Sequence, residues 1–331
     1  MGLSPLIFGC QGSSLSAAER RFFANAQPFG FILFSRNLET PKQIRKLCTE
    51  LRTAVGWHAP VLIDQEGGRV SRLGAPHWFE FLPALDQAAA PQSERLFWLR
   101  GRLIAENLRS FGIDSNCAPL GDIAQPDTHG VLKNRCYGRA LSAVVTHARA
   151  LHQGLRHGGV SGVLKHIPGH GRSTLDSHLD LPRVQADRGS LEKHDFEAFR
   201  QLNTVEMGMT AHLVFEDIDP NHPATHSVAM IDIIRKHVGF NGLLMTDDIS
   251  MEALSGPLDL RARRAQSAGC DIILHCNGQM DQMQLLAGNI YGMDEASQMR
   301  AAQVLAQRPE VQPVDIQQVK AEFDALLGEI R

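Results

Sequence analysis

Residues 243–276 read LLMTDDISMEALSGPLDLRARRAQSAGCDIILHC. A short apolar run (243–247) leads into a helical pattern (258–268) that stops at Gly269, and a second apolar run (271–276) follows at once. The apolar runs are mostly continuous rather than alternating, as expected of strands covered on both faces. This order predicts the strand–helix–strand unit of a parallel sheet.

The same unit recurs along the rest of the chain. Helix starts are marked by two predicted capping boxes, Ser16 with Glu19 and Thr40 with Gln43, and Gly112 and Gly239 mark helix ends. The predicted strands are Leu6–Cys10, Phe31–Phe34, Val61–Asp64, Ile113–Ala118, Gly162–His166, Val205–His212, Leu243–Asp247 and Asp271–Cys276. The segments 142–157, 190–202 and 227–238 are predicted helices in three of the gaps.

Eight strands alternating with helices predict the α/β class and a single (β/α)₈ TIM barrel. We expect one domain over residues 1–331, in which 308–331 form a C-terminal turn and helix (315–330) packed on the barrel. A doubly wound open sheet is the alternative fold. The sequence contains neither a Gly-x-Gly-x-x-Gly turn opening a first helix nor a Walker-type loop, which disfavours nucleotide-binding versions of that fold.

Charge and composition narrow the function classes. The 331 residues carry 33 Lys and Arg against 36 Asp and Glu, a net charge of −3 with neutral histidines. A near-neutral chain without a basic run gives no general attraction to nucleic acid or to anionic lipid. No signal peptide, membrane-length apolar stretch or Cys-x-x-Cys pair occurs. We expect a cytoplasmic monomer with a small-molecule substrate and neither nucleic-acid nor membrane partners.

Catalytic groups of a barrel come from the carboxyl ends of its strands, so polar residues that end apolar runs indicate the site. Asp64, Lys165, His166 and Asp247 all occupy such positions. A carboxylate at Asp247 could attack an anomeric carbon while a second group handles the leaving-group proton. Glu66 is expected to support the following Gly67–Gly68 turn rather than to react.

The loop 165–180 holds the densest cluster of polar side chains, and two interpretations compete for it. Its histidines and aspartates could bind a metal ion, as in a metal-dependent barrel hydrolase. They could instead form a proton-transfer group, with Asp176 orienting His178. The loop lacks a strong metal-ligand spacing, so the second interpretation is favoured, without metal or cofactor. A third class, a catalytically inactive sugar-binding protein, is disfavoured by the intact Asp247, Asp176 and His178.

Several motifs resemble those of glycoside hydrolase family 3 β-N-acetylglucosaminidases. The longest is KHIPGHGRSTLDSH at 165–178, and DQEGGRV at 64–70 resembles the substrate-binding motif. MTAHLVF at 209–215, MTDDISM at 245–251 and AGCDIIL at 268–274 follow in the family's order. Together these motifs extend over most of the chain.

This resemblance implies a cofactor-free, retaining exo-hydrolase that removes terminal β-linked N-acetylglucosamine. In bacterial cytoplasmic members the substrate is a recycled cell-wall fragment, N-acetylglucosamine linked to anhydro-N-acetylmuramic acid, with or without peptide. The resemblance implies that Asp247 is the nucleophile and that His178, oriented by Asp176, is the general acid/base. The residues implied to hold the sugar are Asp64, Arg72, Arg135, Lys165 and His166.

Overall fold

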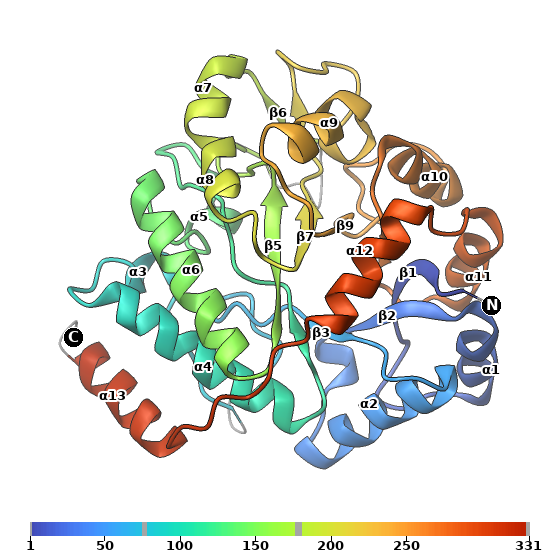
Figure 1. The fold of residues 1–331 in the computed structure, drawn as a ribbon, viewed down its shortest axis with the longest axis horizontal. Coiled ribbons are helices and arrows are strands. Elements are labelled where there is room, and N and C mark those ends of the chain that lie inside the picture. Colours follow the sequence, from blue (N-terminus) through green and yellow to red (C-terminus); the bar gives the residue numbers. More distant parts are fainter. Residues whose placement is uncertain (1, 75–77, 176–180, 329–331) are drawn as a thin grey trace.

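Eight short parallel strands form the centre of the molecule, and helices surround them (Figure 1). The computed structural model describes residues 2–74, 78–175 and 181–328. Around the sheet the hydrogen-bonded order is β10-β1-β2-β3-β4-β5-β7-β9. These strands are β1 (Ser4–Gly9), β2 (Pro28–Leu33), β3 (Val61–Ile63), β4 (Ser115–Asn116), β5 (Ser161–Ile167), β7 (Met207–Thr210), β9 (Leu243–Met245) and β10 (Ile273–His275).

The two ends of this sheet meet, which makes it a barrel. Met245 at the end of β9 pairs in parallel with Ile272, just before β10, and the Thr246 N–H donates to the Ile272 carbonyl. β10 in turn pairs with β1 in parallel register, Leu6 opposite Ile273. Each predicted apolar run therefore lies beside the next one in the chain, and the predicted barrel fold is confirmed.

The helices follow the predicted starts and stops closely. They are α1 (Ala17–Ala26), α2 (Pro41–Val55), α3 (Ala84–Gln87), α4 (Ser93–Ser110), α5 (Gly130–Lys133), α6 (Leu141–His157), α7 (Arg188–Lys193), α8 (Asp195–Gln201), α9 (Val228–Lys236), α10 (Leu258–Ala268), α11 (Met280–Asn289), α12 (Glu295–Ala306) and α13 (Ile316–Gly328). The capping box of Ser16 and Glu19 is complete. Thr40 also caps its helix, but the Gln43 side chain accepts from the Glu39 N–H instead of returning to Thr40.

The predicted helix 190–202 is wrong in one respect, because it is two helices. His194 takes the non-helical angles φ −125° and ψ −70° and separates α7 from α8. After this break the buried Asp195 carboxylate accepts from Arg172 Nε at 2.7 Å, in the loop that follows β5.

Two further short strands, β6 (Arg183–Val184) and β8 (Val214–Phe215), pair with each other outside the barrel.

Two C-terminal helices cover different parts of the barrel. α12 crosses the barrel strands in Figure 1, and its Ala301 and Val304 pack against side chains inside the barrel, among them Phe29 and Met207. α13, the predicted C-terminal helix, packs on α4 with Phe323 fully buried against Phe81. α12 thus closes the amino end of the barrel and leaves the carboxyl end free for a site.

α4 and α6 approach each other unusually closely through two glycines. A Cβ atom at Gly101 would collide with the Leu151 carbonyl, and one at Gly154 would collide with the Trp98 carbonyl.

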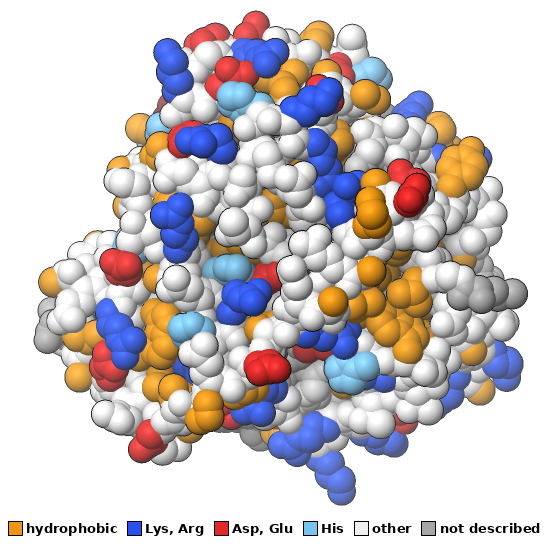
Figure 2. All heavy atoms as spheres, in the orientation of Figure 1, with side chains coloured by type: hydrophobic (Ala, Val, Ile, Leu, Met, Phe, Trp, Pro, Cys, Tyr) orange, Lys and Arg blue, Asp and Glu red, His pale blue; other side chains and the backbone are white. Residues whose placement is uncertain are grey.

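Basic and acidic side chains are interspersed over the face shown in Figure 2. Within residues 2–74, 78–175 and 181–328, no helix combines the length and apolarity needed to cross a bilayer.

Candidate active site

A pocket of about 420 Å³ opens where the carboxyl ends of the barrel strands converge. This volume lies within the roughly 300–1,000 Å³ typical of small-molecule sites. Its charged and histidine residues are Asp64, Arg69, Arg72, His129, Arg135, Lys165, His166, His170, Asp247 and Asp248. The apolar side chains of Ile32, Phe34, Val70, Val131, Leu132, Leu175, Met209, Met251, Leu274 and Cys276 complete its wall.

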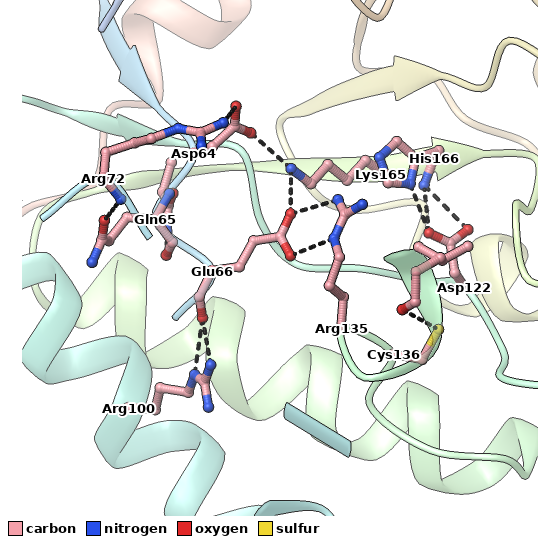
Figure 3. Close-up of polar contacts among 12 residues, drawn as sticks. Asp64, Gln65, Glu66, Arg72, Arg100, Asp122, Arg135, Cys136, Lys165 and His166 are labelled. Carbon is pink, nitrogen blue, oxygen red and sulfur yellow. Dashed lines mark hydrogen bonds and ion pairs between the residues drawn. The ribbon is translucent and has the colours of Figure 1, made fainter. Parts of the chain in front are cut away.

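Asp64 directly follows β3 and lies between two cations (Figure 3). Lys165 Nζ donates to its Oδ1 at 2.8 Å and Arg72 Nη2 donates to its Oδ2 at 3.2 Å. Burial alone would raise the pKa of Asp64, but Lys165 and Arg72 outweigh burial and hold that pKa well below its usual range. Gln65 holds the backbone at Arg72 in place, because its Oε1 accepts the Arg72 N–H at 2.8 Å.

Glu66 also pairs with Lys165, the lysine that binds Asp64. Its carboxylate lies 2.7 Å from Lys165 Nζ and accepts two hydrogen bonds from Arg135, at 3.0 and 2.8 Å. These two cations overcome the effect of burial and lower the pKa of Glu66 to about 2. The expectation that Glu66 serves the Gly67–Gly68 turn holds only for its backbone, whose N–H bonds to the Val70 carbonyl.

Asp122 orients the histidine that follows Lys165. Its fully buried carboxylate accepts from His166 Nδ1 at 2.7 Å and from the His170 backbone N–H at 2.7 Å. Because a carboxylate only accepts, His166 carries its proton on Nδ1 and presents Nε2 as its other polar atom. Burial and the adjacent His166 lower the pKa of His170 to about 4, so His170 is neutral at pH 7.

Asp247 and Asp248, just beyond β9, have different surroundings. Asp248 accepts from the Ser250 and Cys276 N–H groups and from the Ser250 hydroxyl. Among the described residues, the only hydrogen bond to the Asp247 carboxylate comes from the Asp248 N–H, to Oδ1 at 2.8 Å. Burial would raise the pKa of Asp247, but His212, His166 and Lys165 lower it overall. Asp247 is therefore an ionised carboxylate with one oxygen that accepts no hydrogen bond from the described residues.

The structure brings most of the sequence-predicted residues together. Asp64, Arg72, Arg135, Lys165, His166 and Asp247 all line the one pocket. Asp176 and His178 lie outside the described residues. The segment that leads to them is held at Ser173, whose carbonyl accepts a hydrogen bond from the His129 N–H.

The metal interpretation of the loop gains no support from the residues that the structure describes. Within 2–74, 78–175 and 181–328, no three His, Cys, Asp or Glu side chains gather as a group that could hold a metal ion. Asp176, His178 and Asp180 fall outside these ranges, so the interpretation stays a matter for experiment.

Comparison with known proteins identifies the family. The sequence model of the glycosyl hydrolase family 3 N-terminal domain matches residues 10–306. The chain belongs to glycosyl hydrolase family 3. This membership makes it a glycoside hydrolase and confirms the resemblance drawn from the motifs, which lie between residues 64 and 274.

The chain is also similar to named proteins over most of its length. A β-hexosaminidase from Alkalilimnicola ehrlichii is 38% identical over 288 residues, which are 84% of this chain and 82% of that protein. NagZ from Neisseria gonorrhoeae, in its native crystal structure, has a TM-score of 0.85 at 29% identity, covering 100% of this chain and 97% of its own. The same NagZ in complex with N-trifluoroacetyl-D-glucosamine has a TM-score of 0.86 at 28% identity, with the same coverage.

Reasoning from sequence missed the side-chain contacts of two residues at this site, Glu66 and Asp122. Neither lies at the end of an apolar run, and their partners are distant in the chain: 69 residues separate Glu66 from Arg135 and 44 separate Asp122 from His166. The sequence offers two signals for Glu66, its place in the DQEGGRV motif at 64–70 and a count of charges. Lys165, Arg72 and Arg135 need more than one buried carboxylate to balance them.

Proposed function

We propose that this family 3 enzyme is a retaining exo-β-N-acetylglucosaminidase that forms a covalent glycosyl–Asp247 intermediate. One observation carries the choice of nucleophile. Asp64 and Glu66 have both carboxylate oxygens in ion pairs, and Asp248 holds the turn after β9. Asp247, by contrast, has one oxygen in the pocket that no described residue binds. An ionised, desolvated carboxylate in that position suits attack on an anomeric carbon.

The chemistry divides into two balanced steps. In the first, an Asp247 oxygen bonds to the anomeric carbon as the glycosidic C–O bond breaks, and His178 gives its proton to the departing oxygen. In the second, His178 takes a proton from water, whose oxygen bonds to the anomeric carbon and releases Asp247. An imidazole with an ordinary pKa of about 6.5 can serve both steps near neutrality.

The charged wall of the pocket supports a sugar ligand. Asp64, Lys165, Arg72, Arg135 and His166 offer acceptors and donors that can pair with ring hydroxyls and an acetamido group, and an unmatched hydroxyl would leave a buried group unsatisfied. NagZ, whose solved complex contains an N-acylated glucosamine, supports the choice of an N-acetylated sugar. We further propose that the natural substrate is N-acetylglucosamine linked to anhydro-N-acetylmuramic acid from recycled cell wall.

The test is turnover of a chromogenic β-N-acetylglucosaminide, with and without EDTA, beside the matching β-glucoside. We expect release from the N-acetyl sugar alone and no effect of EDTA. Activity abolished by chelation would instead make the loop 165–180 a metal site and overturn the proposed mechanism. Equal turnover of the β-glucoside would reject the specificity. Release of N-acetylglucosamine from the anhydro-muropeptide, followed by mass spectrometry, tests the natural substrate.

A further inference from the structure

A second layer of charge lies behind the pocket wall (Figure 3). Lys165 and Arg135 line the pocket, whereas Glu66 is not part of its lining. The Glu66 side chain is 3% exposed and contacts both cations, with a distance of 2.7 Å to Lys165 Nζ and of 2.8 Å to Arg135 Nη2. One buried carboxylate thus connects two cations that face the ligand space.

Without this carboxylate the two cations would not hold their places. The guanidinium of Arg135 presents a planar fork to Glu66, while Lys165 ends in a compact ammonium on a flexible stem. Both charges are buried, and like charges repel more strongly in a low-dielectric interior than in water. Removal of Glu66 would leave Asp64 as the remaining carboxylate bonded to Lys165 and would leave Arg135 without its ion-pair partner.

Arg100 fixes Glu66 from the opposite side. Its Nε and Nη2 donate to the Glu66 carbonyl at 3.0 and 2.6 Å, and its Nη1 donates to the Leu82 carbonyl and to Gln87 Oε1. Arg100 lies in α4 and is fully buried. The backbone at Glu66 is therefore anchored to α4, while Lys165 and Arg135 hold its carboxylate.

We propose that Glu66 is a positioning residue that sets where Lys165 and Arg135 meet the sugar, without contacting the sugar itself. The identity of that ligand rests on the proposed function. The first consequence concerns binding: loss of Glu66 weakens affinity for the N-acetylglucosamine unit more than it slows the chemical steps at Asp247.

The second consequence concerns pH. The groups that face Lys165 from the surrounding elements are Asp64, Glu66, Arg135, Cys117 and Asp247. Burial favours the neutral amine, but Asp64 and Glu66 outweigh it and keep the pKa of Lys165 above its usual value. In Glu66→Gln one of these two carboxylates is gone while Arg135 stays. Lys165 then loses its proton at lower pH, so binding of N-acetylglucosamine weakens at a lower alkaline pH than in wild type.

The experiment compares wild type, Glu66→Gln and Glu66→Asp in turnover of the chromogenic β-N-acetylglucosaminide across pH. For Glu66→Gln we expect KM and the inhibition constant of N-acetylglucosamine to rise about ten- to a hundredfold, the equivalent of one or two lost hydrogen bonds to charged groups. Glu66→Asp keeps the charge but is too short to reach both cations. It should raise KM while retaining the wild-type pH dependence of N-acetylglucosamine inhibition.

Glu206→Gln is the matched control. Glu206 is equally buried and pairs with His152 at 2.8 Å and with Arg156, but it directly precedes β7, at the opposite end of the barrel. Its loss should lower thermal stability and leave KM and the pH profile unchanged. A folded Glu66→Gln with the KM and pH profile of wild type, or a Glu206→Gln with the same rise in KM, would overturn the positioning role. If Glu66→Gln does not fold, a Glu66→Asp with wild-type KM overturns it equally.

A crystal structure of a Glu66 variant separates this proposal from the proposed function. We expect Lys165 Nζ and the Arg135 guanidinium to leave their wild-type positions, whichever sugar the enzyme cleaves. Unmoved side chains would refute the role of Glu66 even if wild type hydrolyses the substrate. Wild-type enzyme that turns over no N-acetylglucosaminide would reject the proposed function while displaced cations still support the positioning role.

Discussion

Five carboxylates meet in and behind the pocket, and their hydrogen-bond partners separate their roles. Asp64 and Glu66 are bound by cations, Asp122 by His166, and Asp248 by the turn that follows β9. Asp247 receives only the N–H of its neighbour from the described residues. An engaged carboxylate is a poorer nucleophile because its lone pairs are already used, so the hydrogen-bond partners support the proposed choice of Asp247.

The substitution Asp247→Asn tests that assignment. Removing the charge should lower kcat by roughly a thousandfold or more, as expected for loss of a covalent nucleophile, with little change in thermal stability. Asp248→Asn is the control, because an amide oxygen can still accept from the Ser250 and Cys276 N–H groups. Steady-state kinetics of the two variants decides the matter, and an Asp247→Asn variant that approaches wild-type turnover would remove Asp247 from the reaction.

Residues of the site differ in how far the sequence could predict them. Asp64 and Asp247 stand at or just beyond the ends of apolar runs, and barrel topology alone makes such positions converge. The role of Glu66 shows only in contacts across the fold, which no local pattern encodes. The roles of Asp176 and His178 stay predictions, drawn from the resemblance and from their spacing in the loop.

At the scale of elements, the contact between α4 and α6 links packing to the site. Gly101 and Gly154 let the two helices touch backbone to backbone, and Arg100, which anchors Glu66, directly precedes Gly101 in α4. A shift of α4 away from α6 would therefore move the anchor of the second charge layer. The sequence predicted a helix over 142–157 and a helix end at Gly112, but it could not show the close approach of α4 and α6, because a glycine within a helical pattern does not reveal its neighbour.

Gly154→Ala tests this close approach. The new methyl group meets the Trp98 carbonyl, so α4 and α6 must separate, and we expect a loss of about 1–3 kcal/mol in the free energy of unfolding. Gly288→Ala is the control, because this glycine of α11 has open space around its Cβ position and Ala is the better helix former. Urea unfolding measures both. Equal stabilities of the two variants would show that the contact between α4 and α6 accommodates an added methyl group.

At the scale of the whole molecule, the closed barrel was predictable and its details were not. Eight alternating runs require neighbouring parallel strands, and the chain order around the barrel follows from that alternation. The ladder of β6 with β8 is two residues long in each strand, too short for any periodicity to appear. The break at His194 separates two helical segments that share one apolar pattern, so it shows only once Asp195 is seen to meet Arg172.

The response of the whole fold to acid follows from groups buried in the neutral or the ionised state. Burial lowers the pKa of His170 and of His226 to about 4, with neighbouring histidines adding to the effect. The unfolded chain protonates these rings near pH 6.5, so between pH 6.5 and 4 it binds more protons than the folded chain. Stability must therefore fall as the pH drops through this window. Glu66, whose pKa is about 2, adds a further loss below pH 4.5.

Urea unfolding at several pH values between 7.5 and 4.5 checks this expectation. We expect the free energy of unfolding to fall throughout, with His170 contributing up to about 2–3 kcal/mol because each pKa unit corresponds to about 1.4 kcal/mol. His226→Gln removes one titrating ring that does not line the pocket and should make the fall shallower. A free energy that stays flat down to pH 4.5 would mean that these rings protonate in the folded protein near their ordinary pKa. The pocket would then hold a charged His170 beside His166, and its balance of charge would differ from the one derived above.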